Sequence, residues 1–265
     1  MMASTAPAPA ARLALPCWAD LSGRTVLVTG ASSGLGRGCA LALAACGADL
    51  ILASRTERSL AEVSAEIELT SSAHVRTMVL DVTDTHVVRE RIAALPRLDA
   101  LVNNAGQNFP QWLKDVDETR FDAIFALNVK AAFFVAQACV AKFREGGRGG
   151  AIVNVSSQMG HVGAAKRAVY CASKHALEGM TKAMAVELAP EAIRVNSVCP
   201  TFIATPMTAP MFEEPEFRAE VMLKIPLGRV GTVEEVASAI AFLLSPAASL
   251  ITGSSLLIDG GWTAQ

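Results

Sequence analysis

Tyr170 and Lys174 are the residues whose types and spacing most directly suggest chemistry in this sequence. Tyr170 is the single tyrosine among 265 residues, in the stretch AVYCASKHAL. On a helix, a spacing of four puts two side chains on one face. A free phenol is a weak base at neutral pH, but a nearby ammonium favours the phenolate. The pair is a candidate general acid–base unit, although such pairs also arise by chance and a lone tyrosine can be core packing.

Two serines and an asparagine are candidates for the same site. Ser156 and Ser157 end the apolar stretch AIVNVSS, at the edge where open parallel sheets bind ligands. One hydroxyl could donate to a substrate carbonyl, and alternation along a strand points the two in different directions. Either could instead be an ordinary turn hydroxyl. Asn128 interrupts the helical stretch FDAIFALNVKAAFFVAQ, where asparagine fits poorly; it would hold a water at a local distortion or make a local hydrogen bond.

A glycine-rich turn follows the first apolar stretch. The sequence TVLVTGASSGLGRG places Gly30, Gly34 and Gly36 between a predicted strand and a predicted helix. Glycine permits a tight turn and close approach of a pyrophosphate, and the helix N-terminus offers free N–H groups to that anion. The spacing is G-x-x-x-G-x-G, and glycines also occur in plain turns. The strand–turn–helix context favours dinucleotide binding.

The end of the second predicted strand bears on the type of dinucleotide. An acidic residue there would bind the ribose hydroxyls and repel a 2′-phosphate. The sequence instead reads LASRTER, with Ser54 followed by Arg55. Both can hydrogen-bond a phosphate, and Arg37 could assist or could be a surface residue. We therefore expect NADP(H), with NAD(H) as the alternative.

The elements that position these residues alternate along the chain. Nearly continuous apolar runs, typical of strands covered on both faces, are separated by helical patterns. This predicts a single-domain doubly wound parallel sheet of about seven strands with helices on both faces, over residues 21–265. Residues 1–20 are expected to be a flexible tail, and the long connection 201–231 a substrate loop. The predicted strands are 25–29, 49–53, 75–80, 100–104, 151–156, 193–198 and 255–259, and the predicted helices include 35–46, 60–69, 121–143, 170–188 and 233–244.

Composition excludes several other classes of protein. Hydrophobic residues make up 52% of the chain and the formal net charge is −2, so neither disorder nor a nucleic-acid partner is expected. The longest apolar run, CALALAACGA, is too short to span a bilayer, and the N-terminus lacks the pattern of a secretory signal. Six cysteines without a C-x-x-C pair and four histidines without ligand spacing predict a cytoplasmic protein with reduced thiols and no metal.

Taken in order, the motifs resemble those of the short-chain dehydrogenase/reductase family from about residue 21 to the C-terminus. The resemblance implies a Rossmann-like fold and NAD(P)-dependent interconversion of a secondary alcohol and a ketone. The family usually has thirteen residues from the catalytic serine to the tyrosine, which selects Ser157 over Ser156. One departure is Thr201 after Pro200, where the family often has glycine. The matching stretches are TGASSGLG at 29–36, LDV at 80–82, NNAG at 103–106, Asn128, VSS at 155–157, YCASK at 170–174 and RVNSVCP at 194–200.

The resemblance also assigns roles. Tyr170 would donate a proton to the ketone, Lys174 would lower its pKa and bind the nicotinamide ribose, Ser157 would polarise the carbonyl, and Asn128 would anchor a water. Asp81 and Val82 would flank the adenine. The residues expected to bind the cofactor are Gly30, Ser32, Ser33, Gly34, Leu35, Gly36, Ser54, Arg55, Asp81, Val82, Asn103, Ala105, Gly106, Tyr170, Lys174, Pro200, Ile203 and Thr205.

The substrate is expected to be small and polar. Local similarity to the sugar-ketone (xylulose-type) reductases of the family favours a polyhydroxylated ketone. A 3-oxoacyl-thioester reductase and a non-catalytic dinucleotide-binding sensor or scaffold are the alternatives. The family implies a homotetramer built on helices 121–143 and 170–188, with a homodimer as the alternative. Besides Ser157 and Tyr170, the expected substrate contacts are Asn108, Gln158 and His161, and further pocket candidates are Gln107, Trp112, Val162 and Met207.

Overall fold

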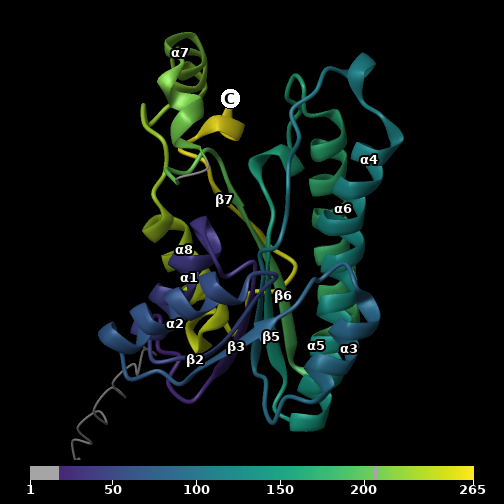
Figure 1. Cartoon of the computed structure of the whole chain (residues 1–265), viewed down its shortest axis with the longest axis vertical. Coiled ribbons are helices and arrows are strands. Elements are labelled where there is room, and N and C mark those ends of the chain that lie inside the picture. The colour runs from purple at the N-terminus through teal and green to yellow at the C-terminus, as the bar shows by residue number, and fades with distance from the viewer. Residues whose placement is uncertain (1–17, 206–207) are drawn as a thin grey trace, which may run out of the picture.

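Seven parallel strands form one continuous sheet in the computed structural model, which describes residues 18–205 and 208–265 (Figure 1). The strand order is β3-β2-β1-β4-β5-β6-β7, and every neighbouring pair is parallel. This confirms the predicted doubly wound sheet. The strands are β1 Thr25–Thr29, β2 Asp49–Ser54, β3 Val75–Val79, β4 Ala100–Asn103, β5 Gly150–Val155, β6 Ile193–Pro200 and β7 Ser255–Ile258.

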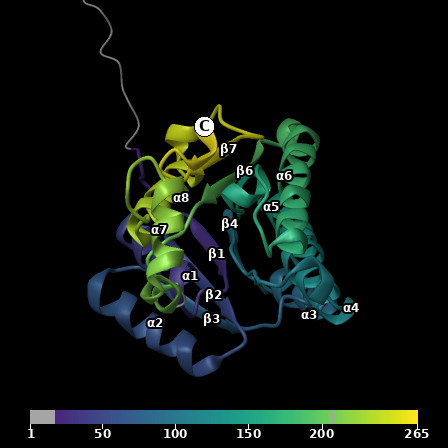
Figure 2. The same ribbon diagram turned by 90° about the horizontal axis from the view of Figure 1, so that it is seen from above.

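Helices cover both faces of the sheet. Figure 2 shows α1, α2 and α8 on one side and α3, α5 and α6 on the other. The buried side chains divide in the same way into two hydrophobic clusters, one on each face. The helices are α1 Gly34–Ala45, α2 Glu57–Thr70, α3 Thr85–Ala93, α4 Glu118–Phe125, α5 Ala132–Gly146, α6 Ala168–Leu188, α7 Pro215–Lys224 and α8 Val233–Leu244.

Successive residues of β1 point into opposite cores. Val26 and Val28 belong to the cluster beneath α1, α2 and α8, whereas Leu27 belongs to the cluster beneath α3, α5 and α6. All three are fully buried. Burying one such side chain contributes about 1.5–3 kcal/mol, so a run without polar interruption is needed for a strand covered on both faces.

The order of the strands reverses at β1, which pairs with β2 on one side and β4 on the other. The chain leaves β1 toward one face and β4 toward the opposite face. A crevice therefore opens at the carboxyl ends of these strands, after Thr29 and Asn103. The glycine turn and the residues after β4 both lie at this point.

The long helix predicted at 121–143 is three segments in the structure. A π-helical turn, Ala126–Ala131, joins α4 to α5, and Asn128 lies within it. The run Glu118–Gly146 is long and apolar enough to cross a membrane, with a mean hydropathy of 1.8 over an 18-residue window. A core helix passes the same test, and Val135 and Phe143 of α5 are buried against the sheet.

The N-terminal boundary of the domain lies close to the predicted residue 21. Residues 1–17 of the predicted tail lie outside the described residues, as does Met207. Residues 18–20 contact the body: Ala19 and Leu21 are buried, and the Ser245 hydroxyl donates to the Trp18 carbonyl at 2.9 Å. The body therefore begins slightly before residue 21.

The connection 201–231 contains a short 3₁₀ helix, Ala209–Glu213, and α7. Phe202 packs against Trp262, with 6.0 Å between ring centroids, and the Thr201 N–H donates to the Ile258 carbonyl at 3.1 Å. The segment after β6 is thereby joined to the C-terminal segment after β7. Together they cover the carboxyl end of the sheet (Figure 1).

Candidate functional site

Two adjoining cavities lie at the carboxyl edge of the sheet. One, of about 670 Å³, follows the glycine turn and the ends of β2 and β3. The other, of about 390 Å³, surrounds Tyr170. They share Leu35, Asn104, Gly106, Gln107 and Thr205, so they form one crevice. We call the first the nucleotide cavity and the second the tyrosine cavity.

The glycine turn forms one end of the nucleotide cavity. Gly30 has a φ of +65°, and a Cβ on Gly36 would lie 2.2 Å from the Gly30 carbonyl oxygen. Only glycine lets α1 begin this close to the turn. Ser33, the N-cap of α1, makes no side-chain capping bond, and the first helical turn has no acidic residue. The helix N-terminus therefore suits an anion such as a pyrophosphate. The predicted residues Gly30, Ser32, Ser33, Gly34, Leu35 and Gly36 all line this cavity.

The other end of the nucleotide cavity is formed by the residues after β2 and β3. Ser54, Arg55, Asp81 and Val82 line it, and no acidic residue ends β2. The Thr83 hydroxyl and N–H donate to Asp81 at 2.7 and 2.9 Å and hold the pKa of its carboxyl below its usual value, and the Arg55 charge adds to this. This composition fits a phosphate-bearing ribose better than a plain diol.

Arg37 does not contribute to this end of the cavity. Its guanidinium is paired with Glu66 of α2, and it does not line the cavity. Of the two readings that the sequence allows for Arg37, the structure favours a surface ion pair.

Asn103 is a correction to the predicted cofactor contacts. Its side chain is buried away from the crevice and donates to the Ala132 carbonyl at 2.9 Å and to Asn154 Oδ1 at 3.1 Å. The next residue, Asn104, lines both cavities instead. Its Nδ2 donates to the Thr29 carbonyl at 2.9 Å, which ties the end of β4 to the glycine turn. Side chains alternate in direction along an extended chain. Because Asn103 at the end of β4 points into the core, alternation directs the next side chain, that of Asn104, to the crevice.

Tyr170 and Lys174 lie on the same side of α6 and line the tyrosine cavity. Lys174 is buried, and its Nζ donates to the Val155 carbonyl at 2.8 Å. That Nζ lies 5.7 Å from the centroid of the Tyr170 ring. The end of β5 therefore fixes the ammonium beneath the phenol.

Burial has opposite effects on the two groups. It raises the pKa of Tyr170 to about 12, against the lowering effects of the Ser157 hydroxyl and Arg167. It lowers the pKa of Lys174 to about 8, against the raising effects of Cys199 and Glu178. Lys174 is not among the groups that lower the Tyr170 pKa, so the lowering by Lys174 that the sequence predicts is not found and burial dominates. The phenol is protonated at neutral pH, as a general acid must be.

Ser157 and Ser156 point in different directions, as alternation predicts. The Ser157 hydroxyl donates to Gln158 Oε1 at 3.0 Å beside Tyr170. Ser156 interacts with the buried carboxylate of Glu178. Both serines line the tyrosine cavity, and Ser157 is the one whose hydroxyl lowers the pKa of the Tyr170 phenol.

Asn128 is held by its neighbours within the π-helical turn. Its Oδ1 accepts from the Gln107 N–H at 2.9 Å, and its Nδ2 donates to the Gln107 carbonyl at 2.9 Å and to the Ser173 hydroxyl at 3.0 Å. The helix distortion expected at this position is present, and the side chain makes local hydrogen bonds. The Gln107 loop is thereby tied to α6.

The predicted substrate contacts divide into two groups. Gln107, Asn108, Ser157 and Gln158 line the tyrosine cavity, as do the predicted cofactor residues Pro200, Ile203 and Thr205. Trp112 and Val162 do not line it.

His161 is a second correction. Its Nε2 lies 3.4 Å from Cys199 Sγ and 3.6 Å from Glu178 Oε2, outside the tyrosine cavity. The 3₁₀ turn Gln158–Gly160 after β5 redirects the chain before this residue.

Arg167 is a lining residue that the sequence reading missed. It lies three residues before Tyr170 and contributes to the tyrosine cavity. It precedes the predicted helix 170–188 and is the N-cap of α6 with a non-helical backbone, so the helical pattern of the sequence did not mark it. The other lining residues not predicted are Pro110, Met159, Thr201, Phe202 and Thr208.

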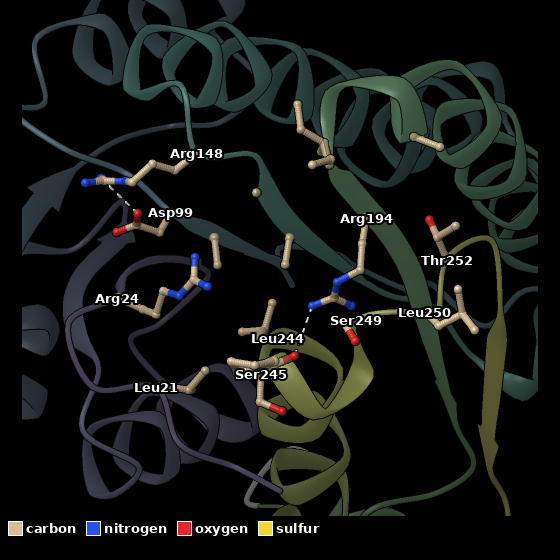
Figure 3. A pocket seen from close by; sticks show the side chains of 17 residues that line it. Leu21, Arg24, Asp99, Arg148, Arg194, Leu244, Ser245, Ser249, Leu250 and Thr252 are labelled. Carbon is tan, nitrogen blue, oxygen red and sulfur yellow. Dashed lines mark hydrogen bonds and ion pairs between the residues drawn. The ribbon is translucent and has the colours of Figure 1, made fainter. Parts of the chain in front are cut away.

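A third cavity, of about 450 Å³, lies at the opposite edge of the sheet, at the starts of β4, β5 and β6 (Figure 3). Two of its three arginines make structural contacts. Arg194 donates to the carbonyls of Leu243 and Ser245 at 2.7 and 3.2 Å, which holds the C-terminus of α8. Arg148 pairs with Asp99 at 3.1 Å. Tyr170, Lys174 and Ser157 all lie at the other edge of the sheet.

Sequence comparison gives matches over nearly the whole chain. A family model described as Enoyl-(Acyl carrier protein) reductase matches residues 30–263. The L-xylulose reductase of Bos taurus is 39% identical over 244 residues, covering 92% of this chain and 98% of that protein. The cyclopentanol dehydrogenase of Comamonas testosteroni is 41% identical over 246 residues, covering 91% and 98%.

Solved structures with the same fold include two informative neighbours. A short-chain type dehydrogenase/reductase from Mycobacterium marinum has a TM-score of 0.87 at 39% identity, covering 93% of this chain and 98% of that one. A gluconate 5-dehydrogenase from Burkholderia cenocepacia, in complex with NADP and tartrate, has a TM-score of 0.87 at 29% identity, covering 93% and 97%.

Proposed function

The chain belongs to the short-chain dehydrogenase/reductase family, and we propose that it interconverts a secondary alcohol and a ketone with NADP(H). The observation that carries the proposal is the grouping of Tyr170, Lys174 and Ser157 in one cavity that adjoins the nucleotide cavity. When bound, the nicotinamide cofactor supplies or accepts the hydride. Residues 21–265 form the catalytic domain in this proposal, with 201–231 as the substrate loop.

Each side chain has a distinct task in ketone reduction. The Tyr170 phenol gives its proton to the carbonyl oxygen, and the Ser157 hydroxyl donates a hydrogen bond to the same oxygen. Lys174, held on the Val155 carbonyl, stabilises the phenolate that this transfer leaves. Asn128 fixes the Gln107 loop against α6 through its amide. In the oxidative direction, the same phenolate takes the proton of the alcohol.

NADP(H) is the proposed cofactor because of the residues after β2. Ser54 and Arg55 offer a hydroxyl and a guanidinium where a carboxylate would repel a 2′-phosphate. The complex of the related gluconate 5-dehydrogenase with NADP is consistent with this.

The proposed substrate is a small polyhydroxylated ketone or its alcohol. Asn108 and Gln158 in the tyrosine cavity can hydrogen-bond substrate hydroxyls, and a relative is an L-xylulose reductase. A 3-oxoacyl thioester is the second candidate, because the matching family model is described as a reductase of acyl carrier protein substrates. A non-catalytic nucleotide-binding scaffold is a weaker candidate, since it would not need Tyr170 or Lys174.

We also propose a cytoplasmic homotetramer, with a homodimer as the alternative. The free thiols of Cys39, Cys139 and Cys199, each with a pKa raised by burial, suit a reducing compartment. Phe133 on α5 and Val186 on α6 are 40% and 80% exposed, and apolar side chains on these helices suit a contact between copies.

A panel of ketones with NADPH tests the substrate proposal. Purified protein would be assayed on L-xylulose, on cyclopentanone and on a 3-oxoacyl thioester, with NADPH and with NADH. We expect turnover on the ketose and faster reaction with NADPH. Activity on the acyl thioester with none on ketoses would contradict the sugar proposal, and tighter binding of NADH would contradict the role of Ser54 and Arg55.

A further inference from the structure

The charged side chains that line the tyrosine cavity are all cationic. They are Lys174 and Arg167, and no aspartate or glutamate lines the cavity. Lys174 is engaged by the Val155 carbonyl and lies beneath the phenol. Arg167 is therefore the cation available to a group that enters from the substrate side.

Arg167 is buried without a partner. It is only 9% exposed, and its side chain makes no hydrogen bond or ion pair with residues 18–205 or 208–265. All 25 acidic residues of the chain lie between Asp20 and Asp259, within those ranges. Burial lowers the pKa of Arg167 below its usual value. A guanidinium that is largely removed from water and has no ion-pair partner loses hydration, and an anionic ligand would offset that loss.

The backbone before α6 directs Arg167 into the cavity. Lys166 has a left-handed conformation, with φ of +61°, which is unfavourable for a residue with a side chain. The Gln111 N–H donates to its carbonyl at 3.0 Å and holds this conformation. Arg167 follows as the N-cap of α6, three residues before Tyr170. The strained turn thus places the guanidinium on the tyrosine side of the helix.

Three more unpartnered polar atoms lie in the same cavity. Ser156 Oγ, Gln158 Nε2 and Thr201 Oγ1 are buried and make no hydrogen bond within the described part of the chain. Ser156 interacts with the Glu178 carboxylate, which leaves the other two for a ligand. Because the Ser157 hydroxyl donates to Gln158 Oε1, the free end of that amide is its N–H₂ donor. Arg167, Gln158 and Thr201 thus offer donors that no described residue satisfies.

We propose that Arg167 binds a carboxylate of the substrate, so that the substrate is a polyhydroxylated keto acid or the matching hydroxy acid. The planar fork of a guanidinium fits the two oxygens of a carboxylate, and the Gln158 amide and Thr201 hydroxyl supply donors for substrate oxygens. The inference rests on the proposed function, because it assigns the charge of the molecule whose carbonyl meets Tyr170 and Ser157.

Binding tests this without turnover. Titration calorimetry of the protein with NADPH would compare D-gluconate with D-glucitol, a neutral polyol of the same carbon chain that lacks the carboxylate. An alcohol cannot react with NADPH, so only affinity is measured. We expect gluconate to bind wild type and glucitol to bind at least about tenfold more weakly, the scale of a charge-assisted hydrogen bond. Arg167→Gln should abolish the difference.

Activity provides the second measurement. The substrates are 5-keto-D-gluconate and L-sorbose, which has the same stereocentres with a hydroxymethyl group in place of the carboxylate. Arg167→Gln should lower kcat/KM on the acid about 10- to 100-fold and on L-sorbose much less, because only the loss of the charge beside Tyr170 acts on both substrates, with Arg167→Lys intermediate. Lys166→Gln is the matched control: it removes the neighbouring charge, does not alter a lining residue, and should leave both substrates unchanged.

The outcomes separate the two proposals. Equal affinity of wild type for gluconate and glucitol, or an equal loss on both ketones in Arg167→Gln, would overturn the carboxylate site. Gluconate binding that depends on Arg167, without turnover of any ketone, would overturn the proposed reaction and retain the site. Unchanged NADPH affinity and melting temperature in Arg167→Gln would show that the variant is folded.

Discussion

In the proposed mechanism, burial prepares Tyr170 as the proton donor beside Lys174. The phenol is held protonated by a pKa raised to about 12, and the amine beside it has a pKa lowered to about 8. A group that is to give a proton at neutral pH needs its acid form in place beforehand. The protonated phenol of Tyr170 therefore favours ketone reduction, the direction in which it gives up its proton.

The two directions should differ in their dependence on pH. Reduction uses the phenol, so kcat/KM for the ketone should be flat below pH 8 and should fall above it as Lys174, with its pKa of about 8, loses its charge. Oxidation needs the phenolate, whose fraction rises about tenfold per pH unit below the raised pKa. Steady-state rates in both directions over pH 6–10 measure this. Profiles that rise together with pH would contradict it.

The sequence predicted single residues of the cavity where a motif marks them. It was wrong or silent where the direction of a side chain determines whether the residue lines the cavity. Tyr170, Lys174 and Ser157 line the tyrosine cavity as the spacing suggested. His161 does not, because the 3₁₀ turn after β5 carries it toward Glu178, and sequence alone does not give that turn. Arg167 was missed because it lies before the predicted helix 170–188, where the pattern gives no direction for a side chain.

At the scale of elements, the glycine turn and α1 act as one unit. A Cβ on Gly36 would lie 2.2 Å from the Gly30 carbonyl oxygen and 2.5 Å from Asn104 Nδ2. The turn, the helix and the end of β4 are therefore packed without space for a methyl group. This packing sets the position of the helix N-terminus that faces the nucleotide cavity.

Gly36→Ala should therefore weaken both stability and cofactor binding. Overpacking of this kind costs about 1–3 kcal/mol of unfolding free energy, and NADPH affinity should fall with the displaced helix. Gly179→Ala is the control, because nothing lies within 4 Å of a Cβ on that exposed position in α6. It should stabilise the protein by roughly 0.5–1 kcal/mol. Urea unfolding distinguishes the two, and equal effects would contradict the packing argument.

The end of β2 carries the prediction on cofactor choice. Arg55→Ala should raise the Kd of NADPH about tenfold and leave that of NADH unchanged, because only NADPH has the 2′-phosphate. Arg37→Ala is the matched control, since Arg37 is paired with Glu66 and does not line the nucleotide cavity. Fluorescence titration measures both affinities. An equal change for the two cofactors in Arg55→Ala would mean that the arginine does not read the phosphate.

Strands and helices were predictable because their apolar patterns are strong, but the π-helical turn was not. The pattern at 121–143 is helical throughout, and the structure inserts the turn Ala126–Ala131 within it. A single turn with i→i+5 hydrogen bonds shifts the following residues by about one position, and so short a change does not stand out in the apolar pattern. Only Asn128, an unsuitable residue for a buried helix position, marked the place.

At the scale of the whole molecule, the continuous apolar strands and the alternation with helices predicted the doubly wound sheet. The strand order places β1 between β2 and β4, which brings the glycine turn, Asn104 and the end of β5 to one edge. That topology puts segments far apart in sequence around one crevice. The opposite edge holds a cavity in which Arg194 of β6 instead holds the C-terminus of α8 (Figure 3).

The prediction for the whole molecule concerns its oligomeric state. Light scattering coupled to gel filtration should give about four times the chain mass of 27.7 kDa. Phe133→Glu, on the exposed side of α5, should shift the protein to smaller species while NADPH binding is retained, because the residue does not line the nucleotide cavity. A monomeric wild type would contradict the tetramer, and a mass of two chains would select the dimer.

The most direct test of the whole account is NADPH oxidation by wild type and Tyr170→Phe on a ketone that wild type accepts, with NADPH affinity measured for both. Removing only the hydroxyl keeps the ring and removes the proton donor. We expect Tyr170→Phe to lose turnover by about 10²–10⁴-fold with unchanged NADPH binding. Turnover that survives in Tyr170→Phe with full cofactor binding would contradict it.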